Sequence, residues 1–269
     1  MTPEFYDTHC HLDFPDFKEG VGEVVRRAQE AGITRLVTIG TELPSSLRAI
    51  ELAAAYEPVW AAVGWHPSDA MDAPPDVRPR LRELVSQPKV VAIGEIGIDH
   101  YRLPSQRGGS EEQDERAKAR QVEVFRQQLE VAAELGLNCV IHQRSALEPT
   151  LEVFAPFANR VKGVFHCFVD DPAAMRRIVE LGSLVSFTGI VTFKNAETVR
   201  DSLRAVPADR FMLETDAPFL APMPYRSKRC EPAYVREIAV FAAEVRGVSL
   251  EQLSAETCAT ARGFFRGLE

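Results

Sequence analysis

Short apolar runs alternate with longer helix-like segments along the whole of this 269-residue chain. The apolar runs are mostly continuous, which is typical of strands buried on both faces of a parallel sheet. Eight strand–helix units in about 250 residues fit a single (β/α)8 TIM barrel, an α/β fold. No linker rich in Gly, Ser or Pro divides the chain, so we predict one domain over residues 1–269. The strands are expected at residues 5–13, 35–40, 59–64, 90–95, 138–142, 162–166, 184–187 and 211–216.

Helices are expected between and after these strands, and one polar segment does not fit the alternation. In the segment 102–120, the pair Gly108-Gly109 precedes an acidic run that cannot bury much apolar area. We therefore expect a mobile loop near the mouth of the site, following a loop at 96–101. The alternative is that segment 102–120 lengthens the N-terminal turn of the next helix. The helices are expected at residues 21–31, 45–56, 80–86, 121–135, 146–157, 172–181, 196–205, 233–246 and 250–265.

Composition limits the classes of function. The formal net charge of −8 argues against a protein that is held on nucleic acid by overall charge alone. It does not exclude a nucleic-acid substrate, because metal ions or a local basic loop can supply a positive field. The five cysteines are odd in number and form no C-x-x-C motif, which predicts reduced thiols and a cytoplasmic protein. No apolar run approaches the roughly 20 residues of a membrane span, and we expect no secretion signal.

Histidines and carboxylates gather where the predicted strands end. His9 and His11 are separated by one residue, so their side chains point the same way in an extended segment and form a natural pair of metal ligands. Strand ends also carry Glu95, His142, His166 and Asp216. In a TIM barrel the active site forms at the carboxyl ends of the strands, so these side chains are expected to converge.

Four imidazoles and two carboxylates are too many ligands for one tetrahedral ion. They suit two divalent ions a few ångströms apart, and we assign Glu95 as the carboxylate between them. Such pairs of ions clamp the attacking and leaving oxygens of a hydrolysis and lower the pKa of a bound water. Mixed nitrogen and oxygen ligands suit Zn, Mn, Fe or Ni, and Mg is possible where carboxylates and water dominate.

Some candidates have equally plausible structural roles. Asp216 precedes Ala217-Pro218 and could be only a turn residue. His66, in Gly64-Trp65-His66-Pro67, could contact substrate or cap a loop. Asp99 and His100 are expected to have loop roles.

The motifs resemble those of the TatD-type metal-dependent hydrolases, a family within the amidohydrolase superfamily, over nearly the whole chain. Seven matches follow the family's order, at residues 5–13, 64–67, 94–99, 141–146, 166–168, 188–196 and 213–218. The resemblance implies that His9, His11 and Asp216 hold one metal and that His142 and His166 hold the other, with Glu95 bridging. It also implies deoxyribonuclease activity, often 3′→5′ on single strands. Departures at Asn138, Val169-Asp170, Ser227 and Cys230 affect no metal ligand but leave the choice of substrate open.

We therefore predict a divalent-metal-dependent hydrolase that cleaves phosphodiester bonds in DNA with a metal-bound water. Asp216, with Glu95, is the predicted catalytic carboxylate, and Asp216 is expected to take the proton of the water. Substrate contacts are predicted for His66, Arg144, Lys194, Arg226 and Arg229. For the basic side chains the alternative is a solvated surface charge.

Other functions stay open at this point. RNA could replace DNA as the substrate. Alternatively, the chain could be an ester or amide hydrolase of the same fold, such as a D-aminoacyl-tRNA deacylase, with aminoacyl-tRNA as its substrate. A small-molecule amidohydrolase also stays open, although Glu95 stands where strand four of such enzymes usually carries a lysine. A non-catalytic metal-binding scaffold is the third class. We expect no membrane association and no obligate protein partner.

Overall fold

The computed structural model describes residues 3–17 and 20–268. Eight parallel strands form one sheet in which each strand pairs with the next along the chain. A parallel bridge between Cys10 and Ala217 brings the segment after the last strand against the first. The predicted (β/α)8 barrel is thereby confirmed. The strands are β1 (Phe5–Cys10), β2 (Ile33–Ile39), β3 (Val59–Val63), β4 (Val90–Asp99), β5 (Cys139–Arg144), β6 (Gly163–Phe165), β7 (Leu184–Phe187) and β8 (Phe211–Leu213).

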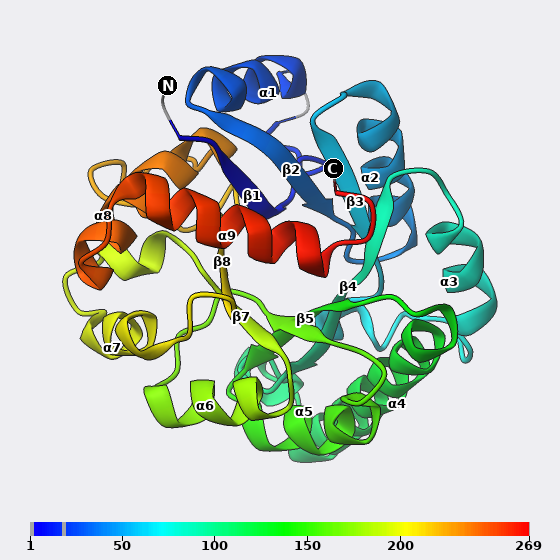
Figure 1. The fold of residues 1–269 in the computed structure, drawn as a ribbon. Helices are drawn as coiled ribbons and strands as arrows, with labels where there is room; N and C mark the ends of the chain where they lie inside the picture. The colour runs from blue at the N-terminus through cyan, green and yellow to red at the C-terminus, as the bar shows by residue number, and fades with distance from the viewer. Residues whose placement is uncertain (1–2, 18–19, 269) are drawn as a thin grey trace.

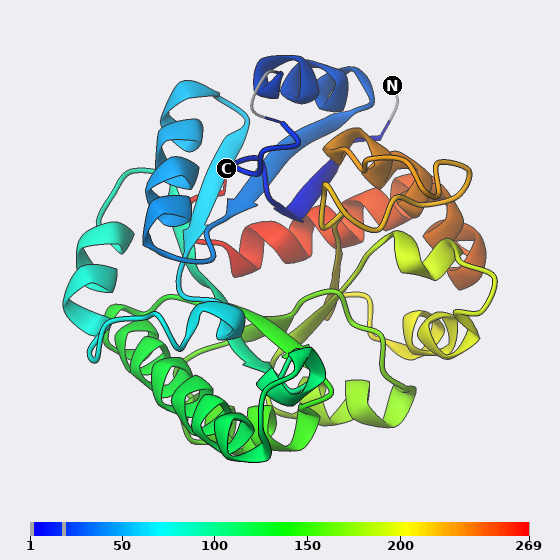
Figure 2. The ribbon, with the colours of Figure 1, turned by 180° about the vertical axis from the view of Figure 1, so that it is seen from behind.

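Helices surround the sheet, and α9 crosses one end of the barrel (Figures 1 and 2). Buried side chains of α9, among them Cys258 and Phe264, share a core cluster with strand residues such as Tyr6 and Trp60. This end of the barrel is therefore filled. The helices are α1 (Val21–Glu30), α2 (Leu43–Ala55), α3 (Arg78–Val85), α4 (Glu111–Leu135), α5 (Leu147–Phe154), α6 (Pro172–Glu180), α7 (Glu197–Ala205), α8 (Val235–Arg246) and α9 (Leu250–Phe264), and the short 3-10 turns are η1 (Pro67–Asp69), η2 (Pro104–Arg107), η3 (Ala155–Phe157), η4 (Gly189–Thr192) and η5 (Pro232–Tyr234).

Both faces of the barrel strands are buried, which explains their continuous apolar runs. Leu36 packs in the larger core cluster, while its neighbour Val37 packs in the cluster that α9 covers. Successive strand residues therefore serve two different cores. Hydrophobic burial on both faces stabilises the strands that carry the polar side chains at their carboxyl ends.

The prediction of a loop at residues 102–120 is wrong for most of this segment. Helix α4 begins at Glu111, and Ser110 and Gln113 form a reciprocal capping box. Acidic residues in the first turn favour this helix end through the helix dipole. The alternative of a longer helix is correct, although it adds ten residues rather than one turn.

The expected loop at 96–101 is also partly wrong, because β4 continues to Asp99. Ile96 and Ile98 are buried, and Gly97 pairs with His142 of β5. In the part of the chain that the structure describes, no helix combines the length and apolar character of a membrane span.

Candidate metal centre

Six predicted ligands meet at the carboxyl ends of the strands, at the end of the barrel opposite α9. His9, Glu95 and His142 lie within β1, β4 and β5. His11, His166 and Asp216 follow β1, β6 and β8 within a few residues. All but Asp216 and His142 are nearly inaccessible to solvent. The convergence expected from the sequence is therefore present.

Glu95 lies between two groups of imidazoles, and each group faces a different oxygen. Glu95 Oε2 lies 3.4 Å from His9 Nε2 and 3.7 Å from His11 Nε2. Glu95 Oε1 lies 2.7 Å from His142 Nδ1 and 2.8 Å from His166 Nε2. One carboxylate thus contacts two separate sets of nitrogen ligands.

Asp216 joins the first of these groups. Its Oδ1 lies 3.4 Å from His11 Nε2 and 3.6 Å from His9 Nε2. Asp7, buried in β1, accepts hydrogen bonds from Thr215 N and Thr215 Oγ1 at 2.9 and 2.6 Å. This contact ties the segment after β8 to β1. Because Asp216 faces His9 and His11, it is more than a turn residue before proline.

Several ring nitrogens are free to bind a cation. His11 Nδ1 donates to Ile39 O at 3.1 Å, which leaves the Nε2 lone pair directed toward Asp216 and Glu95. Within residues 3–17 and 20–268, the buried nitrogen His9 Nδ1 has no hydrogen-bond partner, and His166 Nδ1 faces only the Glu214 carboxylate, 3.5 Å away. Among the described residues, three overlapping groups of His and Glu side chains have ligand atoms within 4.8 Å of one another. The donor set fits divalent metal ions.

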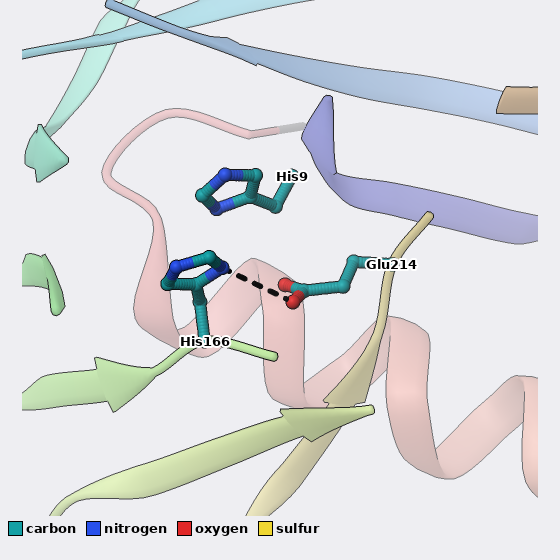
Figure 3. A group of neighbouring side chains, drawn as sticks. All are labelled: His9, His166 and Glu214. Carbon is teal, nitrogen blue, oxygen red and sulfur yellow. Dashed lines mark ion pairs between the residues drawn. The ribbon is translucent and has the colours of Figure 1, made fainter. Parts of the chain in front are cut away.

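A third carboxylate, Glu214, points toward His166, with His9 beside them (Figure 3). Its Oε1 is 3.5 Å from His166 Nδ1 and accepts a hydrogen bond from Cys167 N at 2.6 Å. The His166 ring stacks on that of His9 with 4.0 Å between centroids. Sequence reasoning did not single out Glu214, although a buried carboxylate at the end of an apolar strand needs a positive partner.

The electrostatics of the site favour positive charge at its centre. Burial opposes ionisation of Glu95, but the charge of His166 and hydrogen bonds with His142 and His166 hold its pKa well below its ordinary value. Burial also opposes protonation of His166, yet Glu95 and Glu214 raise the pKa of this imidazole well above its ordinary value. The carboxylates therefore create the negative potential that a divalent cation requires.

Asp99 contacts the metal centre instead of having only the expected loop role. Its Oδ2 lies 3.2 Å from His142 Nε2, and its Oδ1 accepts hydrogen bonds from Tyr101 N and Arg102 N. Burial opposes its ionisation, but the hydrogen bond with His142 contributes to lowering the pKa of Asp99 to about 2. Asp99 is four residues beyond Glu95, so an extended β4 places both side chains on one face.

His66 both caps a turn and faces the site. Its Nδ1 accepts a hydrogen bond from Ser68 N at 3.0 Å, at the start of η1. The proton of the neutral ring is therefore on Nε2, which lies 3.4 Å from Glu95 Oε1. Burial lowers the pKa of His66 to about 4, so the ring is neutral at physiological pH.

The site opens into a cavity of about 510 Å3. Of the predicted substrate contacts, His66 and Arg144 line this cavity, as does Arg102. Lys194 and Arg226 do not line it, and the Arg226 guanidinium lies 3.6 Å from the centre of the Phe193 ring.

Arg229 also lies outside the cavity lining. It donates hydrogen bonds to Asp16 O and to the Glu231 carboxylate, at 2.7 and 2.6 Å. Its guanidinium therefore has protein partners already, and contact with substrate stays a prediction for Lys194, Arg226 and Arg229.

An eight-stranded parallel barrel with imidazoles and carboxylates at its carboxyl ends defines a metal-dependent hydrolase of the TIM-barrel class. The sequence matches the family of TatD related DNases over residues 6–266, and the chain belongs to that family. The predicted family and class of enzyme are thereby confirmed.

Individual relatives agree over nearly their full lengths. The chain is 36% identical to the uncharacterized metal-dependent hydrolase YabD of Bacillus subtilis, covering 97% of this chain and 98% of the relative. It is 34% identical to the 3′-5′ ssDNA/RNA exonuclease TatD of Klebsiella pneumoniae, covering 97% of each. The crystal structure of YJJV, a TatD homolog from Escherichia coli K12, superposes with a TM-score of 0.88 at 27% identity, covering 98% of this chain and 99% of that one.

Proposed function

We propose that this chain is a divalent-metal-dependent nuclease that cleaves phosphodiester bonds in single-stranded DNA, from the 3′ end. The observation that carries the proposal is the division of the Glu95 carboxylate between two sets of imidazoles. The name of the Klebsiella relative, a 3′-5′ exonuclease of single-stranded DNA and RNA, supports the same substrate class. RNA is therefore a second substrate to test.

The residues fit two ions. His9, His11 and Asp216 would hold one, and His142 and His166 would hold the other, with Glu95 shared between them. When bound, such ions supply positive charge to the phosphate and acidify water. Zn, Mn, Mg, Fe and Ni are all compatible with these ligands.

The side chains around the centre have distinct tasks in this proposal. Asp216 accepts the proton of the attacking water at its carboxylate, which the hydrogen bonds of the preceding Thr215 to Asp7 hold in place. His66 presents Nε2–H toward the centre, where this group donates a hydrogen bond to a phosphate oxygen. Arg144, at the mouth of the cavity, neutralises a neighbouring phosphate.

The alternative of a D-aminoacyl-tRNA deacylase is not favoured, because the Klebsiella relative named above is a nuclease. All eight strands belong to one sheet, which supports one domain over residues 1–269. A cytoplasmic location stays a prediction.

The test is metal analysis of the purified protein followed by assays with each metal added back after chelation. Substrates are single-stranded DNA labelled at either end, RNA, duplex DNA and a D-aminoacyl-tRNA. We expect release of nucleotides from the 3′ end of single strands, and loss of this activity in Glu95→Gln and His142→Ala. Full activity after extensive chelation would exclude the metal-dependent mechanism. Deacylation without any nuclease activity would establish the alternative.

A further inference from the structure

One exposed aromatic side chain lines the cavity, and another contacts Arg144, which lines it. Among the described residues, the two exposed large aromatic side chains are Tyr101 and Phe219, which are 57% and 49% exposed. Phe14 lies beside Phe219, and both line the cavity. Exposed apolar groups gathered beside a cavity indicate a binding surface.

Phe14 and Phe219 form one pair, which is fixed to the first ligand group. Their ring centroids are 5.7 Å apart with an angle of 81° between the planes. The Phe14 ring also packs on the His11 ring at 4.8 Å, and Phe219 N donates to Asp216 O at 2.9 Å. This pair, the Phe14/Phe219 wall, is therefore held at a set position beside His11 and Asp216.

Tyr101 and Arg144 form a second pair, which is fixed to the other ligand group. The Arg144 guanidinium lies 3.9 Å from the centre of the Tyr101 ring. Tyr101 N donates to Asp99 Oδ1 at 2.8 Å, and Asp99 in turn contacts His142. This pair, the Tyr101/Arg144 wall, combines an exposed ring with a cation.

The two walls lie on opposite sides of the metal centre. The Phe14/Phe219 wall follows β1 and β8, and the Tyr101/Arg144 wall follows β4 and β5. In a barrel whose eight strands follow one another in chain order, the β8/β1 side is opposite the β4/β5 side. A phosphate at the centre would therefore have one wall on each side.

We propose that the two walls bind the unpaired nucleobases on either side of the scissile phosphate. This inference rests on the proposed nuclease function and names how that site selects single strands. Each base has an apolar π-face that stacks on an aromatic ring whatever its sequence. Bases in a duplex are stacked and paired with one another, so they cannot offer these faces without being unstacked.

The test measures how much a base contributes to binding, with and without each ring. Nuclease-resistant phosphorothioate oligothymidylate is compared with an oligomer of the same backbone whose two 3′-terminal nucleotides are abasic. Fluorescence anisotropy gives Kd for both oligomers with the wild type, Phe219→Ala, Tyr101→Ala and the conservative variant Phe219→Trp. Val240→Ala is the control, because it also truncates an exposed apolar side chain, on α8 and outside this cavity.

We expect the wild type to bind the oligomer with bases about five-fold or more tighter than the abasic one. Phe219→Ala and Tyr101→Ala should each reduce this ratio with unchanged metal content, whereas Phe219→Trp and Val240→Ala should retain it. If all variants show the same ratio of the two Kd values and still cleave single strands, the stacking proposal is overturned but the nuclease function is not. If the wild type binds neither oligomer and does not cleave unmodified single-stranded DNA, the nuclease function is overturned and this inference with it.

Discussion

Gln128 of α4 holds both main-chain polar atoms of Trp65: Trp65 N donates to Gln128 Oε1 at 2.8 Å, and Gln128 Nε2 donates to Trp65 O at 3.0 Å. Gln121, two turns earlier on the same helix, holds the main chain of Asp99 in the same way. Asp99 N donates to Gln121 Oε1 at 3.0 Å, and Gln121 Nε2 donates to Asp99 O at 3.1 Å. Trp65 precedes His66, and Asp99 contacts His142. One helix therefore fixes the main chain at two edges of the metal centre.

Gln128→Leu is predicted to destabilise the protein. The substitution leaves the buried N–H and C=O of Trp65 without partners, which should cost about 2–4 kcal/mol in the free energy of unfolding. Urea denaturation at a fixed metal concentration measures the change. Gln87→Leu, at an exposed position, serves as the control. Equal stability of both variants would show that the Trp65 contact contributes little.

Asp99→Asn is predicted to weaken metal binding. It removes the charge beside His142 Nε2 while an amide oxygen can still accept from Tyr101 N and Arg102 N. Partners of metal-bound histidines typically contribute about 10- to 100-fold in affinity. Competition with a chelator of known affinity gives the metal Kd, and Asp76→Asn at the surface is the control. An unchanged Kd would reduce Asp99 to the loop role expected from the sequence.

Arg144→Gln is predicted to flatten the salt dependence of binding to single-stranded DNA. Arg144 lines the cavity, so loss of one phosphate contact should change the slope of log affinity against log salt by about 0.7. Arg229→Gln should leave the slope unchanged, because this guanidinium is bound to Asp16 O and Glu231. The opposite pattern would support the sequence-based prediction that Arg229 contacts the substrate.

Ser110→Ala is predicted to lower stability with little effect on catalysis. The change removes the cap of α4, which should cost about 1 kcal/mol. Thermal unfolding measures this loss, with Ser86→Ala, at the end of α3, for comparison. Altered preference for substrate length with unchanged stability would favour the mobile loop that the sequence predicts for 102–120.

Local patterns identified much of this architecture. Apolar runs and helical periodicity gave the barrel, because each strand must bury both faces whatever its partners are. The same reasoning placed Glu95, His142 and Asp216 at strand ends. The start of α4 was missed although its signal is local, since Ser110 and Gln113 have the spacing of a capping box.

The amino-acid sequence by itself determined the fold class and the residue types available to bind metal, because both follow from periodicity along one segment. Only the tertiary structure decided which oxygen of Glu95 faces which histidines, and that Asp99 supports His142. It also decided that Arg229 pairs with Glu231 while Arg144 lines the cavity. These relationships depend on barrel closure and on the directions of side chains from segments far apart in the sequence, which no local pattern encodes.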